Sequence, residues 1–85
     1  MNEQTLITDL SKLEKAIHKN ERYAEKDTDS EMRKQYSKDA RDLNNVADAI
    51  RAGDHKKAAR LIYKLDTIVR DQLPTRLYNE VMKSF

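Results

Sequence analysis

The sequence has no cysteine and no tryptophan, and its 85 residues include one glycine, one proline, four tyrosines and one phenylalanine. Without cysteine there can be no disulfide, thiolate metal site or cysteine nucleophile, which fits a reducing cytosol. All-β folds need frequent turn residues, so one glycine and one proline weigh heavily against them. No long apolar run and no signal-peptide pattern is present. We therefore expect a soluble, cytoplasmic protein that does not span a membrane.

Length and composition predict a single domain, residues 1–85, with an economical core. Apolar residues make up 38% and charged residues 38%, more charge than the usual ~25%. That mixture suits helices with one buried face. The net charge of +2 is too small to identify a nucleic-acid-binding protein.

The first segment carries two rows of regularly spaced side chains. The heptad-like spacing of its apolar row predicts a helix from Gln4 or Thr5 to about Lys26. The apolar row comprises Leu6, Leu10, Leu13, Ile17, Asn20 and Ala24. A basic row lies two residues out of phase, nearly on the opposite side of the helix. It comprises Lys12, Lys15, Lys19, Arg22 and Lys26.

A second helix is predicted after residues 27–30, with Thr28 and Glu31 as a capping box or Ser30 as the cap. One continuous helix is the alternative, but the apolar positions shift by two residues across 27–30, which favours a turn. The second apolar row comprises Met32, Tyr36, Ala40, Leu43, Ala47 and Ile50.

The next boundary is marked by Gly53, which can take a left-handed conformation, and by Asp54, which can cap a third helix. So short a connection predicts an antiparallel helical hairpin. The third helix runs until Pro74 ends or kinks it at Leu73, and a short C-terminal helix or bent extension follows. The apolar positions of the third helix are Ala58, Leu61, Ile62, Leu65, Ile68 and Val69. We expect an all-α antiparallel bundle of three main helices plus this short one, with coiled-coil-like packing and a homodimer favoured over a monomer.

The sequence contains little that indicates a catalytic or metal-binding site. His18 and His55 are the only histidines, and Glu14 lies one turn before His18 on the same helix face. We interpret Glu14 and His18 as a solvent-facing pair, because a metal site needs three or four convergent ligands. With no glycine-rich phosphate loop and no nucleophile motif, we expect neither an enzyme nor a cofactor or metal.

The basic row, which spans about 21 Å, is the sharpest candidate contact surface. Its alternative is a solvated outer face. A second basic group lies on the third helix at Lys56, Arg60 and Lys64, where a solvated face is again the alternative. Asn20 either fixes the helix register or the oligomeric state, or marks where the apolar row frays into the turn.

The C-terminal apolar residues include Tyr78 and Phe85, which either fold back over the bundle or dock on a partner. We therefore expect a non-enzymatic interaction module, a regulator, adaptor or inhibitor, whose basic row contacts an acidic protein surface with Tyr78 and Phe85 as anchors. A nucleic-acid-binding protein using the same basic rows and a structural homo-oligomer are the alternatives.

Overall fold

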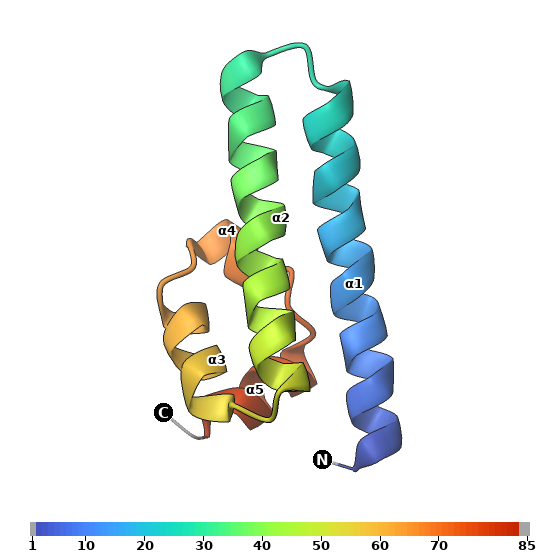
Figure 1. Ribbon diagram of the computed structural model, residues 1–85, viewed down its shortest axis with the longest axis vertical. Helices are drawn as coiled ribbons and strands as arrows, with labels where there is room; N and C mark the ends of the chain where they lie inside the picture. The colour runs from blue at the N-terminus through green and yellow to red at the C-terminus, as the bar shows by residue number, and fades with distance from the viewer. Residues whose placement is uncertain (1, 84–85) are drawn as a thin grey trace.

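The computed structural model describes residues 2–83, which form five helices and no strands. Helix α1 spans Glu3–Lys26 and α2 spans Ser30–Arg51. The two helices run antiparallel as one long hairpin, and three shorter helices pack beside part of it (Figure 1). These are α3 (His55–Tyr63), α4 (Thr67–Arg70) and α5 (Thr75–Met82). The predicted all-helical class is confirmed for these residues.

The α1–α2 connection forms at residues 27–29, as the phase shift predicts, but its cap differs from the prediction. Asp29 caps α2 by accepting a hydrogen bond from the Glu31 N–H at 2.9 Å, so neither Thr28 nor Ser30 is the cap. The Asp27 carboxylate in turn accepts the Asp29 N–H at 2.8 Å. Two aspartates thus stabilise a turn that contains neither glycine nor proline.

The α2–α3 connection follows the prediction. Gly53 has a φ of 75°, which only glycine adopts at little cost. Its N–H donates to the Ile50 carbonyl, and the Asp54 N–H donates to the Ala49 carbonyl, closing the end of α2. The Asp54 side chain then accepts the Lys57 N–H at 3.0 Å and caps α3.

The prediction of one continuous third helix is wrong, because this segment is broken into α3 and α4. After Tyr63 the chain tightens into a turn and becomes extended at Asp66. Arg70 compensates for the break: its guanidinium donates to the carbonyls of Tyr63 and Leu65 at 3.1 and 2.9 Å. Ile68, predicted to be buried, is 79% exposed as a result. The predicted helix end at Leu73 is also wrong, because α4 already ends at Arg70, and Pro74 instead stands at the N-cap of α5.

The core lies where α3, α4 and α5 cover the hairpin. Of the predicted α1 row, Leu13, Ile17 and Asn20 are buried. The buried apolar residues of the other helices and their connections are Ala40, Leu43, Val46, Ala47, Ala49, Ile50, Ala58, Ala59, Ile62, Leu65, Val69, Leu73, Leu77 and Val81.

The three short helices cover only part of the hairpin's length. In Figure 1 they lie beside its lower part, and none of residues 2–83 forms a third layer over the part next to the α1–α2 connection. We call residues 3–20 and 39–51 the covered half, and residues 21–38 the uncovered half. Met32 and Tyr36, predicted as core, lie in the uncovered half, where Met32 is 39% exposed and Tyr36 half-buried. That part of the prediction is wrong because no third layer reaches them.

Candidate interaction surfaces

The basic row of α1 faces away from the rest of the molecule. Lys12, Lys15, Lys19, Arg22 and Lys26 are all exposed. The Lys19 ammonium lies 5.7 Å from the centre of the Tyr23 ring, a cation–π contact. Within residues 2–83 none of the five forms an ion pair, whereas Lys38, Arg51, Arg76 and Lys83 each do.

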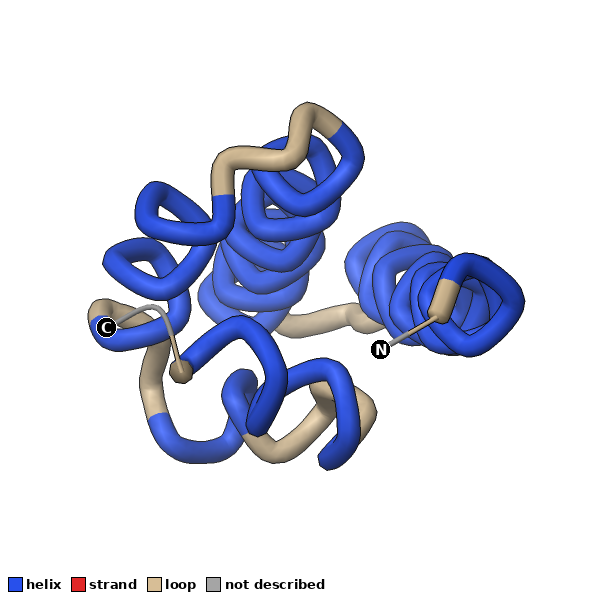
Figure 2. Tube along the Cα trace, turned by 90° about the horizontal axis from the view of Figure 1, so that it is seen from below, coloured by secondary structure: helices blue, strands red, loops and turns tan. Residues whose placement is uncertain are grey.

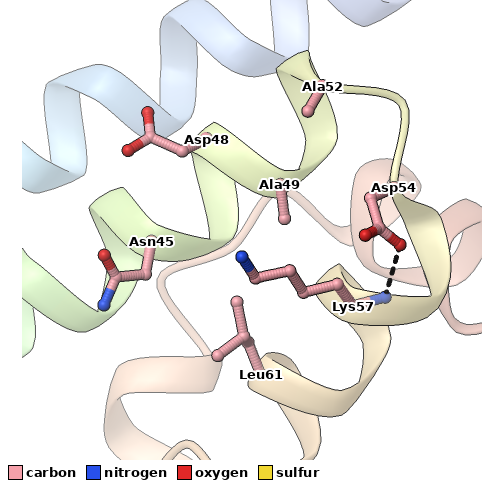
Figure 3. Close-up of a pocket in the computed structure, with 7 residues that line it drawn as sticks. All are labelled: Asn45, Asp48, Ala49, Ala52, Asp54, Lys57 and Leu61. Atoms are coloured by element: carbon pink, nitrogen blue, oxygen red, sulfur yellow. Dashed lines mark hydrogen bonds between the residues drawn. The ribbon is translucent and has the colours of Figure 1, made fainter.

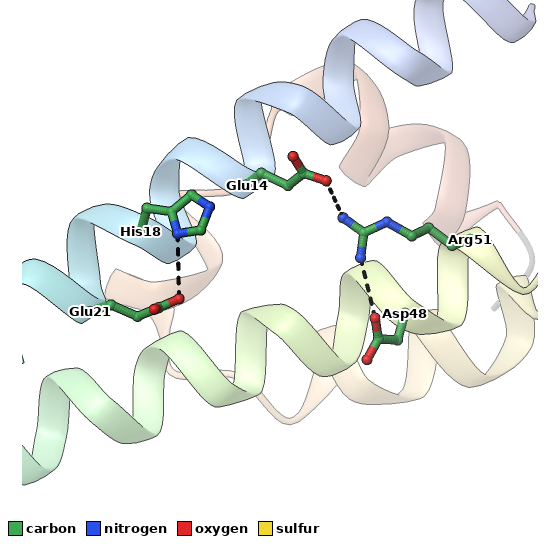
Figure 4. Close-up of polar contacts among 5 residues, drawn as sticks. All are labelled: Glu14, His18, Glu21, Asp48 and Arg51. Carbon is green, nitrogen blue, oxygen red and sulfur yellow. Dashed lines mark hydrogen bonds and ion pairs between the residues drawn. The ribbon is translucent and has the colours of Figure 1, made fainter.

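Two of the acidic residues beside this row, Glu14 and Glu21, contact other side chains. Glu14 pairs with Arg51 of α2, and Arg51 also contacts Asp48 at 3.2 Å (Figure 4). His18 Nδ1 lies 3.6 Å from Glu21 Oε1, so the predicted pairing of His18 with Glu14 is wrong. Because Glu14 reaches across to α2, it does less to neutralise the basic row than its place in the sequence suggests.

The second basic group does not extend the first. Lys56, Arg60 and Lys64 are exposed on α3, opposite its buried residues. Helices α1 and α3 lie on either side of α2 when the molecule is viewed along its length (Figure 2). The two basic rows therefore face different directions and cannot contact one flat partner together.

The C-terminal helix packs back on the bundle. Leu77 and Val81 are buried, and Tyr78 and Met82 are half-buried against the core. Of the two predicted alternatives, residues 77–82 therefore fold back over the bundle, and only part of the Tyr78 side chain stays accessible to a partner. Phe85, the other predicted anchor, lies outside the described residues.

Two partly buried polar contacts join α1 to the C-terminal segment, and one of them involves a residue, Asp9, that was not predicted from the sequence. Asp9 is 1% exposed and accepts two hydrogen bonds from Arg76 of α5, at 3.0 and 2.9 Å. These hydrogen bonds lower the pKa of the Asp9 carboxyl below its ordinary value of 3.8, outweighing the opposing effect of burial. Asn20 donates to the side-chain oxygen of Gln72 at 2.7 Å, which fixes the position of α1 against the α4–α5 connection.

The spacing of Asp9 could have revealed its buried position. Asp9, Leu13, Ala16, Asn20 and Tyr23 recur at intervals of four, three, four and three residues, so they share one helix face. An acidic residue in such a row needs a partner when it is buried.

A groove lies between α2 and α3 (Figure 3). It has a volume of about 530 Å³ and is lined by Asn45, Asp48, Ala49, Ala52, Asp54, Lys57 and Leu61. Asp54 caps α3, and Asp48 is paired with Arg51. Both carboxylates in the groove thus already have structural partners.

The described residues offer neither a metal-binding cluster nor a membrane-spanning helix. Across residues 2–83, no three or more histidine, aspartate or glutamate side chains converge in a way that could hold a metal ion. No helix in that range is long and apolar enough to cross a membrane. Comparison with protein-family models, curated proteins and solved structures finds no match to this chain.

Proposed function

We propose that this protein is a non-enzymatic interaction module, a regulator, adaptor or inhibitor that binds an acidic surface of a protein partner through the basic row of α1. The observation that carries the proposal is the row itself: five exposed cations, spaced along about 21 Å, that make no ion pair within the described residues. Like charges at this spacing repel each other by a few tenths of a kcal/mol per pair. An acidic partner would relieve that repulsion.

The surroundings of the row favour a protein over a nucleic acid. Single-stranded nucleic acids are bound by aromatic platforms beside cations, and duplexes by side chains that reach base edges. Tyr23 is the aromatic residue of α1 beside the row, and its ring is already in contact with both Lys19 and the ring of Tyr36 on α2. We place this binding in the cytoplasm, in keeping with a chain that lacks cysteine.

The test compares two triple variants of equal charge. Lys12→Glu/Lys15→Glu/Lys19→Glu reverses the α1 row, and Lys56→Glu/Arg60→Glu/Lys64→Glu reverses the α3 row as the matched control. Circular dichroism first checks that both fold. Each variant, and the wild type, is then cross-linked to its binding partners in an extract of the source cells. The extract is used with and without nuclease, so that partners held through nucleic acid are lost. We expect a protein partner that survives nuclease, is retained by the α3 variant and is lost from the α1 variant.

Sedimentation with duplex and single-stranded oligonucleotides, at low and physiological salt, tests the alternative. Co-sedimentation that falls steeply with salt, with a log–log slope of about 0.9 per duplex phosphate contacted, would overturn the proposal in favour of nucleic-acid binding. Capture that is equal for wild type and the α1 variant would instead show that the row is a solvated face. Self-association with no captured partner would indicate a structural homo-oligomer.

A further inference from the structure

A second surface lies beside the basic row, in the uncovered half of the hairpin. On each helix of the hairpin a row of residues shares one helix face, and the α1 row contacts α5 and the α4–α5 connection. On α1 the row contains Asp9, which contacts α5, Asn20, which contacts Gln72, and Tyr23. On α2 the corresponding row comprises Met32, Tyr36, Asp39, Leu43, Val46 and Ile50.

The covering layer stops part-way along both rows. The Asn20–Gln72 hydrogen bond marks its limit on α1. One turn beyond it, Tyr23 is 44% exposed, and on α2 Met32 is 39% exposed while Asp39, a turn beyond Tyr36, is buried. The rings of Tyr23 and Tyr36 pack together with centroids 5.2 Å apart, so the two rows meet as one apolar strip. We call Tyr23, Met32 and Tyr36 the tyrosine strip.

The tyrosine strip has a different charge along each edge. The α1 edge is basic: Lys19 lies over the Tyr23 ring, and Arg22 and Lys26 are exposed on the same side. The α2 side carries both charges, because the exposed Glu31 and Gln35 each immediately precede a strip residue and the exposed Arg33 immediately follows Met32. A ligand with an acidic edge above α1 would therefore match this pattern.

A second copy of the chain fits this surface poorly. If two strips packed with their hairpins antiparallel, a two-fold axis would place α1 on α1, and the basic edges would face each other. If they packed parallel, α1 would face α2, but the short helices of both copies would then occupy the same end and collide. Charge in the first case and shape in the second favour a different partner.

Resting on the proposed function, we infer that the tyrosine strip docks an amphipathic helix of the protein partner, whose apolar face is edged by acidic residues. This helix lies above the uncovered half as α4 and α5 lie above the covered half. Its apolar side chains bury Tyr23 and Met32, and its acidic edge pairs with Lys19 and Lys26. About two helical turns of each hairpin helix are available, a size typical of weak and transient complexes.

The test uses three synthetic helical peptides of about 18 residues, or five turns, titrated into the full chain labelled with ¹⁵N. One has a leucine stripe edged by glutamate, the second has the same stripe edged by lysine, and the third has the composition of the first in scrambled order. We expect the glutamate-edged peptide to bind most tightly and to shift the amide resonances of residues 19–26 and 31–36 most.

Two variants identify the surface. Tyr23→Ser/Met32→Ser removes apolar contact area and leaves the basic row intact, and we expect it to weaken the glutamate-edged peptide by about tenfold or more. Ile7→Ser is the matched control, because Ile7 is also an exposed apolar residue of α1, at 54%, but lies far from the strip. It should leave binding unchanged.

Each other outcome overturns the inference. Equal binding of all three peptides, or loss of binding in Ile7→Ser alone, removes the strip as the site. Concentration-dependent shifts at Tyr23 and Met32 without peptide identify a second copy as the occupant, and equivalent shifts with duplex DNA identify a nucleic acid. If Tyr23→Ser/Met32→Ser keeps the cellular partner that Lys12→Glu/Lys15→Glu/Lys19→Glu loses, the proposed function stands and this inference fails.

Discussion

In the covered half of the hairpin Leu13 and Leu43 are fully buried, whereas in the uncovered half Tyr23 and Met32 keep 44% and 39% of their surface exposed. The same apolar spacing continues through both halves of α2, from Ile50 to Met32. The difference therefore comes from the short helices α3–α5, which provide a third layer for one half and none for the other (Figure 1). Heptad spacing specifies which side of a helix is apolar, and a separate part of the chain decides whether that side is buried.

The largest expected effect contrasts one apolar residue from each half. Leu43→Ala leaves a cavity in the covered half and should lower the free energy of unfolding by about 2–5 kcal/mol. Met32→Ala in the uncovered half should cost less than about 1 kcal/mol, because its side chain is already partly in water. Urea denaturation of both variants measures the difference. Equal losses would mean that the uncovered half is buried in solution, for instance by another molecule.

An intermediate effect is expected at the border between the halves. Asn20→Ala removes the hydrogen bond to Gln72 and leaves the Gln72 oxygen without its donor, which should cost about 1–3 kcal/mol. Asn45→Ala is the matched control, since Asn45 is exposed on α2, and should change stability by less than about 0.5 kcal/mol. If the two variants unfold at the same urea concentration, the Asn20–Gln72 contact does not hold α1 against the α4–α5 connection.

The smallest effect is expected from the Asp9–Arg76 pair, because the Arg76 side chain is 57% exposed and water screens the interaction. The folded-state pKa of Asp9 is lowered, so its stabilising contribution is complete above the unfolded value of 3.8 and is lost as the pH falls through the lower folded value. Urea midpoints measured from pH 7 to pH 2 should therefore fall less steeply below pH 4 for Asp9→Asn than for wild type. The same slope in both proteins would show that other carboxylates cause the acid destabilisation.

The sequence predicts those parts of the fold that depend on local chemistry. Gly53 and Asp54 mark the α2–α3 connection, because a residue that can adopt a left-handed conformation, followed by a carboxylate that can cap a helix, indicates the end of one helix and the start of the next. Leu13 and Ile17 are predicted and found in the core for a similar reason, since their spacing places them on one side of a helix. Pro74 marks the start of α5, because a proline is tolerated at the N-terminal end of a helix, where its missing N–H would have no partner within the helix.

Other parts depend on contacts between residues far apart in the chain. The break between α3 and α4 contains neither glycine nor proline, and it is stabilised by Arg70, which donates to carbonyls up to seven residues earlier. That break decides how far the third layer extends, and so decides the exposure of Met32 and Ile68. The basic row was identified from sequence alone, but the tyrosine strip could not be, because its exposure follows from where the third layer ends.

The Asp9–Arg76 and Asn20–Gln72 contacts also bear on the order of folding. They join residues 67 and 52 positions apart, whereas α1 and α2 are connected by only the residues between Lys26 and Ser30. Closing a long loop costs more chain entropy than closing a short one, and contacts between distant residues slow folding. We therefore expect the α1–α2 hairpin to form first and the C-terminal helix to dock last. Before that docking the hairpin exposes its apolar side along its whole length, whereas the native protein exposes it only in the uncovered half.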